Sequence, residues 1–486
     1  MAVSLVCLLA GGCRKPAVFF PAESDASVAA QVGAERAYDA DGNGQVDFFL
    51  FANEAGRFDR IGYDRTADQH VDQVIPLDAI RFGQCRHLVL ILDGFGFDVV
   101  RDYYDQGHLR LFYPPSRVVA PYPTVTDVSL QDIIDGVPPR AYEAKYFDRA
   151  ANRLVGGADD YLKGVNEPYN KVFEYRADLI WDAFGYVYPE PVFRKEINDA
   201  KRLFDRAETV EVMAYFVSSA GVSTSAGADG QRRCLEAVDR FAQQVVWETR
   251  GLTKVTLLAD HGHAYTPAHL FDYEQYLQEK GWRPGKSLQR GDDVVNPRFG
   301  LLTFARFATL RPAALADDLA GAPGVELVSY ADGSDVVVLD ADGGRAVIRR
   351  RDERYQYERI AGDPLGLAGI LATLPADEQG YYHADELLAA TIDHGYPAPL
   401  QRLWRAHFAL VRNVPDVLVS LANDYCAGKP AFFGYVDLAS THGSLNRANS
   451  VTFIMSTAGP LPPVLQSRDI RQAMRELTGA TWPMDE

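Results

Sequence analysis

Four largely apolar runs, each followed by glycine or small polar residues, limit the possible folds most strongly. They cover residues 87–92, 210–217, 254–259 and 450–456, and helix-like segments separate them. Buried strands of a parallel sheet read as such unbroken apolar runs. The chain is therefore predicted to be an α/β protein with a mostly parallel sheet flanked by helices. In such sheets, ligand sites form beyond the carboxyl ends of the strands.

Composition limits the partners. With 486 residues, 47% hydrophobic and 24% charged, the chain can bury a large core in roughly two or three domains. The formal charge of -17 argues against a partner with a phosphate backbone, so no double-stranded nucleic acid is expected. An anionic substrate would need metal ions or a local cluster of basic residues. No protein partner can be inferred.

The first residues, "MAVSLVCLLAGGC", have the proportions of an export signal. Residues 1–12 are predicted to be this signal, and Ala-Gly-Gly-Cys resembles a bacterial lipoprotein signal, in which Cys13 would be lipidated. The expectation is an exported, membrane-anchored lipoprotein on the periplasmic or extracellular face. The alternative is an apolar first strand. The three other cysteines outside this segment, Cys85, Cys234 and Cys426, are too far apart to indicate a disulfide framework.

Residues 13–80 contain an acidic repeat. "YDADGNGQVD" at 38–47 and "YDRTADQHVD" at 63–72 align at a shift of 25. The first copy places oxygen ligands at alternate positions around a glycine-rich turn, as a calcium loop does; these residues are Asp39, Asp41, Asn43 and Asp47. The alternative for both copies is an acidic β-hairpin turn without an ion.

Three polar residues follow the predicted parallel strands. Asp93 ends the first run, and Asp260 and His261 end the run at 254–259. These side chains are expected to meet at one edge of the sheet. A second Asp-His-Gly at residues 393–395 closes a stretch with helical periodicity, and is predicted to be an ordinary helix end.

Thr126 lies where a strand-like stretch gives way to a predicted helix, in "PYPTVTDVSLQDIIDG". A hydroxyl there meets unpaired N–H groups and the positive end of the helix, which suits an oxyanion or a phosphoryl group. Its alternative role is that of a plain N-cap.

Together these motifs resemble the alkaline phosphatase superfamily, closest to its nucleotide pyrophosphatase and type I phosphodiesterase branch. The resemblance runs from about residue 86 to the end, through "LILDGFG", "YPTVT", "DHG" and "STHG". It implies that Thr126 is the nucleophile of a phosphoric ester hydrolase. It also implies divalent metal, usually two zinc ions, and the metal ligands Asp93, Asp260, His261 and His442.

The chain departs from this pattern at one metal position. The family has an Asp, a His four residues later and a Gly three further on, where this chain has Ala220, Thr224 and Gly227. His263, in "DHGH", is a candidate substitute ligand or general acid; the alternative is a loop histidine that faces solvent. The sulfatase nucleophile motif is absent.

The resemblance divides the chain into core segments at residues 84–265 and 431–486, separated by an insertion at 266–430. Alternating apolar and polar residues predict a β-meander at about 296–360, and the stretch at about 364–410 reads as helical. The insertion is expected to cap the site, or to serve only as packing.

Two functions remain open at this point. One is a metal-dependent phosphodiesterase that acts on a small phosphoester or nucleotide-like substrate. The other is a catalytically impaired, lipid-anchored binding protein, because two ligands of one metal position are missing.

Overall fold

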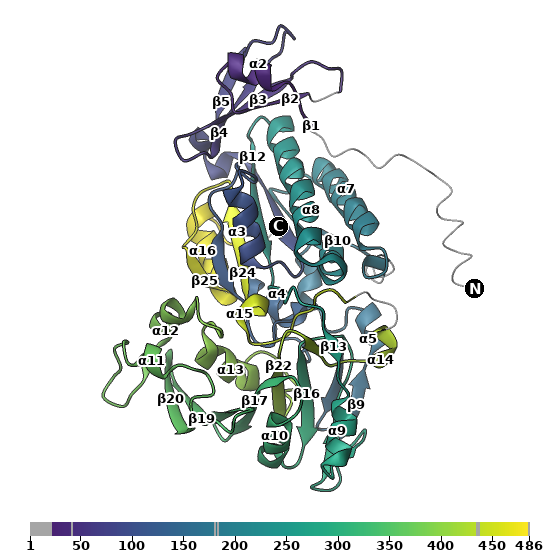
Figure 1. Cartoon of the computed structure of the whole chain (residues 1–486). Coiled ribbons are helices and arrows are strands. Elements are labelled where there is room, and N and C mark those ends of the chain that lie inside the picture. The colour runs from purple at the N-terminus through teal and green to yellow at the C-terminus, as the bar shows by residue number, and fades with distance from the viewer. Residues whose placement is uncertain (1–21, 40–41, 179–180, 182–183, 434–437, 485–486) are drawn as a thin grey trace, which may run out of the picture.

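The computed structural model describes residues 22–39, 42–178, 181, 184–433 and 438–484. The predicted signal segment with Cys13, and Asp41 of the acidic repeat, lie outside these residues. Figure 1 shows three bodies in a row: a small N-terminal sheet, a central α/β core, and a cap built around a second large sheet.

The core is a seven-stranded sheet in the order β10-β11-β6-β12-β24-β7-β25, and it is parallel at every pairing except those of β24. The predicted α/β fold class with a mostly parallel sheet is confirmed. The strands are β6 (Arg86–Leu92), β7 (Ser116–Val119), β10 (Tyr175–Arg176), β11 (Glu211–Phe216), β12 (Thr253–Ala259), β24 (Val451–Ser456) and β25 (Val464–Gln466).

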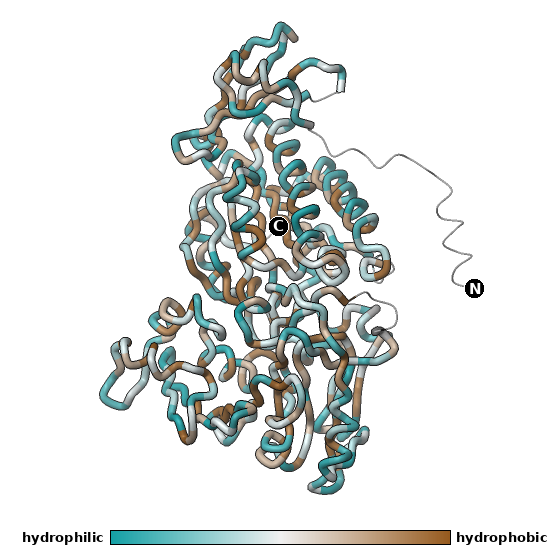
Figure 2. The backbone as a smooth tube through the Cα atoms, in the orientation of Figure 1, coloured by the Kyte–Doolittle hydropathy of each residue, from teal (hydrophilic) through white to brown (hydrophobic). Residues whose placement is uncertain are grey.

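Helices cover both faces of this sheet. On β6, Leu88 and Leu90 pack with α3, α7 and α8, whereas Val89 and Ile91 pack with α4 and α16. This double burial explains the unbroken apolar run. Hydrophobic residues are concentrated in the interior strands, and the outer side of α8 is more hydrophilic (Figure 2). The helices are α3 (Phe97–Asp105), α4 (Thr126–Ile134), α7 (Pro189–Arg206), α8 (Ser218–Glu248) and α16 (Ile470–Thr478).

Two core elements have features that the apolar runs do not reveal. Helix α8 begins at Ser218, directly after β11, and it is interrupted at Gly227, where φ is 54°. Strand β24 runs antiparallel to both of its neighbours. Because of this reversal, the loop that precedes β24, and not its carboxyl end, lies beside the carboxyl ends of β6 and β12.

The cap is a nine-stranded sheet in the order β14-β15-β16-β22-β17-β18-β19-β20-β21. All its pairings except β14 with β15 are antiparallel. Its strands are β14 (Arg283–Pro284), β15 (Asp293–Val295), β16 (Phe304–Thr309), β17 (Val325–Asp332), β18 (Asp335–Asp340), β19 (Arg345–Arg351), β20 (Arg354–Ala361), β21 (Tyr382–His383) and β22 (Val417–Leu421).

Strands β17 to β20 form a meander, but residues 312–320, inside the stretch predicted as β-meander, form helix α10 (Pro312–Ala320). Its proline at the first turn and its run of alanine and leucine favour a helix. Three further helices follow: α11 (Ala368–Leu371), α12 (Ala384–Thr391) and α13 (Pro399–Phe408).

Part of the first core segment packs on the cap. The ribbon of β8 (Lys145–Asp148) and β9 (Arg153–Gly156) contacts cap residues, since the Leu154 N–H donates to the Lys286 carbonyl at 3.2 Å. Nearby, Glu143 forms a buried ion pair with Arg306 of β16. The sequence did not predict this attachment.

Arg402, on α13 of the cap, fastens the cap to the core. Its buried guanidinium donates to the carbonyls of Leu445 at 2.9 Å and Pro121 at 3.4 Å, and to the hydroxyl of Ser450 at 2.6 Å. Burial lowers the pKa of Arg402 to about 9. The two core loops that it reaches are those that carry Thr126 and His442.

The N-terminal sheet has the order β1-β2-β3-β4-β5 and is antiparallel throughout. Its strands are β1 (Ala22–Glu23), β2 (Arg36–Asp39), β3 (Phe48–Ala52), β4 (Phe58–Tyr63) and β5 (Gln73–Pro76), with helix α2 (Ala26–Gln31). In the described residues of the chain, no helix is both long enough and apolar enough to cross a membrane.

The acidic repeat forms two hairpin loops of similar geometry. The carboxylate of Asp39 accepts from the N–H groups of Gly42 and Gly44, and that of Asp64 accepts from Ala67 and Gln69 at the aligned positions. All four of these donors have positive φ. The loop backbone therefore uses the first aspartate of each copy, and calcium in the first loop stays a prediction.

Candidate functional site

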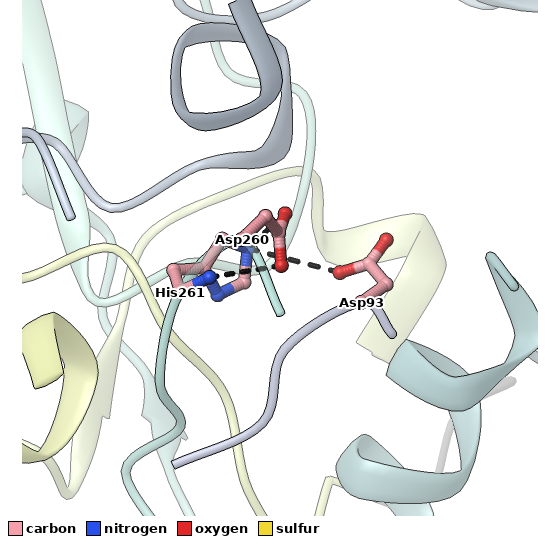
Figure 3. A group of neighbouring side chains, drawn as sticks. All are labelled: Asp93, Asp260 and His261. Atoms are coloured by element: carbon pink, nitrogen blue, oxygen red, sulfur yellow. Dashed lines mark hydrogen bonds and ion pairs between the residues drawn. The ribbon is translucent and has the colours of Figure 1, made fainter. Parts of the chain in front are cut away.

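Asp93, Asp260 and His261 meet at the edge of the core sheet, as the sequence predicted. Strands β6 and β12 are parallel neighbours, and Leu92 pairs with Ala259, so the residues that follow them emerge side by side. One ligand atom from each of the three side chains lies within 4.8 Å of the others, and all three residues are buried (Figure 3).

Only one of the two carboxylate oxygens of Asp260 accepts hydrogen bonds from the described residues. Its Oδ1 accepts from the N–H groups of Gly94 and His261, each at 2.9 Å. Its Oδ2 is buried, 3.3 Å from Nε2 of His261, and makes no hydrogen bond with the described residues. Burial raises the pKa of Asp260 to about 7. An unpartnered buried carboxylate oxygen is costly unless a cation neutralises it.

Two imidazoles expose the same ring nitrogen to the site. Nδ1 of His261 lies 2.9 Å from the Gly262 carbonyl, and Nδ1 of His442 lies 2.8 Å from the Thr124 carbonyl. Because a carbonyl only accepts, Nδ1 carries the proton in both rings and Nε2 keeps a lone pair. This arrangement is usual for metal-binding histidines. Burial lowers the pKa of His261 to about 4 and that of His442 well below its ordinary value.

Thr126 is the first residue of helix α4, so it is not the N-cap; Val125 is. Its Oγ1 lies 3.4 Å from Oδ1 of Asp93 and 3.4 Å from Nε2 of His261. The first-turn N–H groups and the positive end of the helix face the same space. The hydroxyl therefore lies beside both the acidic cluster and a place suited to an anion.

These residues fit a divalent metal ion. Two carboxylates and one imidazole nitrogen are ligands that zinc accepts, and other transition metals accept them too. The unpartnered Oδ2 of Asp260 and the lone pair on His261 Nε2 are the atoms that would hold the ion. The chemistry of this donor set does not select zinc over its competitors.

The second metal position that the resemblance implies lacks two of its expected ligands. Ala220 and Thr224 lie on the first part of α8, and neither carries a carboxylate or an imidazole. His442 remains beside this position, and its ring stacks on that of His261 with centroids 4.1 Å apart.

His263 is fully buried, so the expectation of a solvent-facing loop histidine is wrong. It follows the strand end into the core, where its Nδ1 bonds to the hydroxyl of Ser440. Its Nε2 has no hydrogen-bond partner among the described residues, and its ring centroid is 5.2 Å from that of His442.

The other Asp-His-Gly belongs to a helix end, as predicted. Residues 393–395 follow α12, which ends at Thr391. Asp393 is largely exposed and pairs with Arg117 at 2.6 Å, and His394 bonds to the backbone of Tyr396. Neither takes part in the cluster of Asp93, Asp260 and His261.

A cavity of about 490 Å³ opens between the core and the cap and includes Asp93, Thr126 and His442 in its wall. Tyr215, the penultimate residue of β11, also lines it and donates its hydroxyl hydrogen to Asp93. Sequence reasoning missed Tyr215, because a tyrosine inside an apolar strand reads as core.

No family model matches the chain, and no curated protein sequence matches it. Among solved structures, the chain is similar to murine ectonucleotide pyrophosphatase/phosphodiesterase 5, with 13% identity and a TM-score of 0.42. The match covers 82% of this chain and 97% of the murine one. An inactive form of that murine protein in complex with AMP gives the same identity and coverage, with a TM-score of 0.43.

Proposed function

We propose that the chain is a metal-dependent phosphoric ester hydrolase, of phosphodiesterase type, in which Thr126 is the nucleophile. The observation that carries this proposal is the position of the Thr126 hydroxyl, at a helix N-terminus and 3.4 Å from both Asp93 and His261. The cavity beside it can hold a small phosphoester.

In the first step, Oγ1 of Thr126 attacks phosphorus and the organic alcohol leaves. The Asp93 carboxylate is in reach to accept the proton of the hydroxyl, and the N–H groups of the first turn of α4 face the developing charge on the phosphoryl oxygens. A bound divalent ion would supply positive charge and lower the pKa of the Thr126 hydroxyl. Water then attacks the same phosphorus, which releases the phosphate monoester and restores the Thr126 hydroxyl.

The test is Thr126→Ala. Loss of the attacking oxygen should lower turnover of a p-nitrophenyl phosphodiester by at least about 10³-fold. Metal content, measured by elemental analysis, should stay unchanged, because Asp93, Asp260 and His261 remain. Thr373→Ala, at an exposed position in the cap, is the matched control. Unchanged turnover in Thr126→Ala would refute the assignment of the nucleophile.

The second candidate is a binding protein that has lost hydrolysis, and Ala220 and Thr224 favour it. Phosphoryl transfer needs charge neutralised on the attacking and on the leaving oxygen, and two metal ions usually do both. One metal ion per chain, unchanged in His442→Ala, would favour this reading. Robust metal-dependent turnover by the purified wild type would contradict it.

We also propose that the chain is exported and anchored by a lipid on Cys13. The sequence "LLAGGC" supports this. Mass spectrometry of the mature N-terminus should find a diacylglyceryl group on Cys13, and Cys13→Ser should leave the protein out of the detergent phase. An unmodified Cys13 in a membrane-associated wild type would contradict the proposal.

A further inference from the structure

The cavity beside Thr126 is acidic. Among the described residues that line it, carboxylates outnumber guanidinium groups by four to one. The carboxylates are Asp93, Asp127, Glu143 and Glu167, and the guanidinium is that of Arg176. Asp93 belongs to the metal cluster, which leaves three carboxylates to face the organic part of a substrate.

Two of these three are paired with arginines. Glu167 forms a buried ion pair with Arg176, and Glu143 forms one with Arg306. Glu143 also accepts from the N–H of Gly300 at 2.7 Å. These two charges are therefore largely neutralised within the wall.

Asp127 differs, because the two side chains that donate hydrogen bonds to it, Tyr169 and Asn166, are neutral. Its Oδ1 accepts from the hydroxyl of Tyr169 at 3.0 Å, and its Oδ2 accepts from the amide of Asn166. Burial and the nearby Glu167 raise the pKa of Asp127 well above its ordinary value. A positive group in the cavity would stabilise the charged carboxylate.

Aromatic rings form much of the remaining wall. Tyr161 and Phe299 lie with their centroids 5.7 Å apart. Tyrosine and phenylalanine faces attract cations, and carboxylates add to this attraction. The rings that line the cavity are Tyr142, Tyr161, Tyr169, Tyr186, Tyr215 and Phe299.

We infer that the cavity selects phosphoesters whose organic group carries an ammonium charge, with Asp127 as the specificity-determining residue next to the nucleophile. This inference rests on the proposed hydrolase function. It also disfavours nucleoside diphosphates and triphosphates, because the one arginine among the described lining residues, Arg176, is already paired with Glu167.

Two substrates that differ only in charge test the inference. p-Nitrophenyl phosphocholine and p-nitrophenyl 3,3-dimethylbutyl phosphate share the leaving group and nearly the same shape, but carbon replaces nitrogen in the second. For the metal-loaded wild type, kcat/KM should be about tenfold higher for the choline ester, a difference of about 1.4 kcal/mol. A ratio near one with clear turnover would overturn the inference and leave the hydrolase function standing.

Asp127→Asn assigns the preference to a residue. The ratio of the two kcat/KM values should fall at least about threefold in this variant, because the carboxylate charge is lost. Asp135→Asn, the same substitution at the exposed C-cap of the same helix, should keep the wild-type ratio. An unchanged ratio in Asp127→Asn would remove that residue from the inference.

A binding measurement separates this inference from the hydrolase function. If the metal-loaded wild type hydrolyses neither ester, the hydrolase function fails. Calorimetric titration with choline and with 3,3-dimethylbutan-1-ol then decides the charge preference alone. Tighter binding of choline, weakened by Asp127→Asn, supports a cation site; equal binding, or no binding of choline, overturns it.

Discussion

Polar side chains are arranged differently in the core sheet and in the cap sheet. In the core, Asp93, Asp260 and His261 converge at one edge, and Oδ2 of Asp260 has no hydrogen-bond partner among the described residues. In the cap, charged side chains pair with one another: Arg349 holds Asp335 and Glu358, and Arg351 holds Asp377.

Topology explains the difference. Parallel strands present all their carboxyl ends at one edge, so residues distant in sequence meet there. Antiparallel strands in a meander alternate their ends, and each turn faces solvent separately. A site for a metal ion or a substrate is therefore expected at the carboxyl edge of the core sheet. The cap is expected to shape the cavity beside that edge.

The two Asp-His-Gly tripeptides give the strongest test of this comparison. Asp260→Asn should lower metal affinity at least about 100-fold and turnover at least as much, because a buried ligand loses its charge. Asp393→Asn, in the tripeptide of the cap, should change neither, since Asp393 is largely exposed and pairs with Arg117. Metal titration and phosphodiesterase assays measure both. Equal losses of metal affinity and turnover in the two variants would contradict the assignment of the metal site to the core edge.

Metal removal should give the next largest effect. If an ion binds the core edge, a chelator should lower the melting temperature of the wild type by about 5–10 °C, because the folded state alone binds the ion tightly. The Asp260→Asn protein should melt at the same temperature with and without the chelator. An unchanged melting temperature of the wild type with the chelator would show that this edge of the core sheet binds no ion.

The smallest effect concerns a buried histidine of the cap. His407 bonds to Ser329, and burial lowers its pKa to about 3. The unfolded chain takes up this proton near the ordinary histidine pKa, but the folded chain does not. This contribution to stability is therefore present at neutral pH and is lost as the pH falls from about 6.5 toward 3.

His407→Gln should remove that part of the acid sensitivity. Between pH 6.5 and pH 5 the wild type should lose about 2 kcal/mol more than the variant, measured by denaturant unfolding. His269→Gln, at an exposed position, is the control. Identical pH profiles for the wild type and His407→Gln would mean that His407 is protonated in the folded cap.

The sequence predicted the residues at the strand ends because their pattern is local. An apolar run that stops at Asp93 or Asp260 indicates both the strand and its polar end. The register of the two parallel strands then brings these ends together. The same logic placed a strand-to-helix junction at Thr126, and separated the tripeptide at 393–395 from the one at 260–262.

The sequence could not predict features that depend on tertiary packing. Tyr215 reads as core, and Asp127 reads as a first-turn helix acid, yet both line the cavity. The direction of β24 cannot be read from its composition, because a buried strand is apolar in either direction. The burial of His263 likewise follows from the loop before β24, which supplies its partner Ser440.

The guanidinium of Arg402 has a mechanical consequence. It bridges helix α13 of the cap to both site loops of the core, and its hydrogen bonds go to two backbone carbonyls and a hydroxyl in these loops. Moving the cap away from the core would remove these hydrogen-bond acceptors from the buried guanidinium, which costs several kcal/mol. Movement of α13 away from these two segments of the core is therefore disfavoured, so the cap side of the cavity keeps its position beside Thr126 and His442.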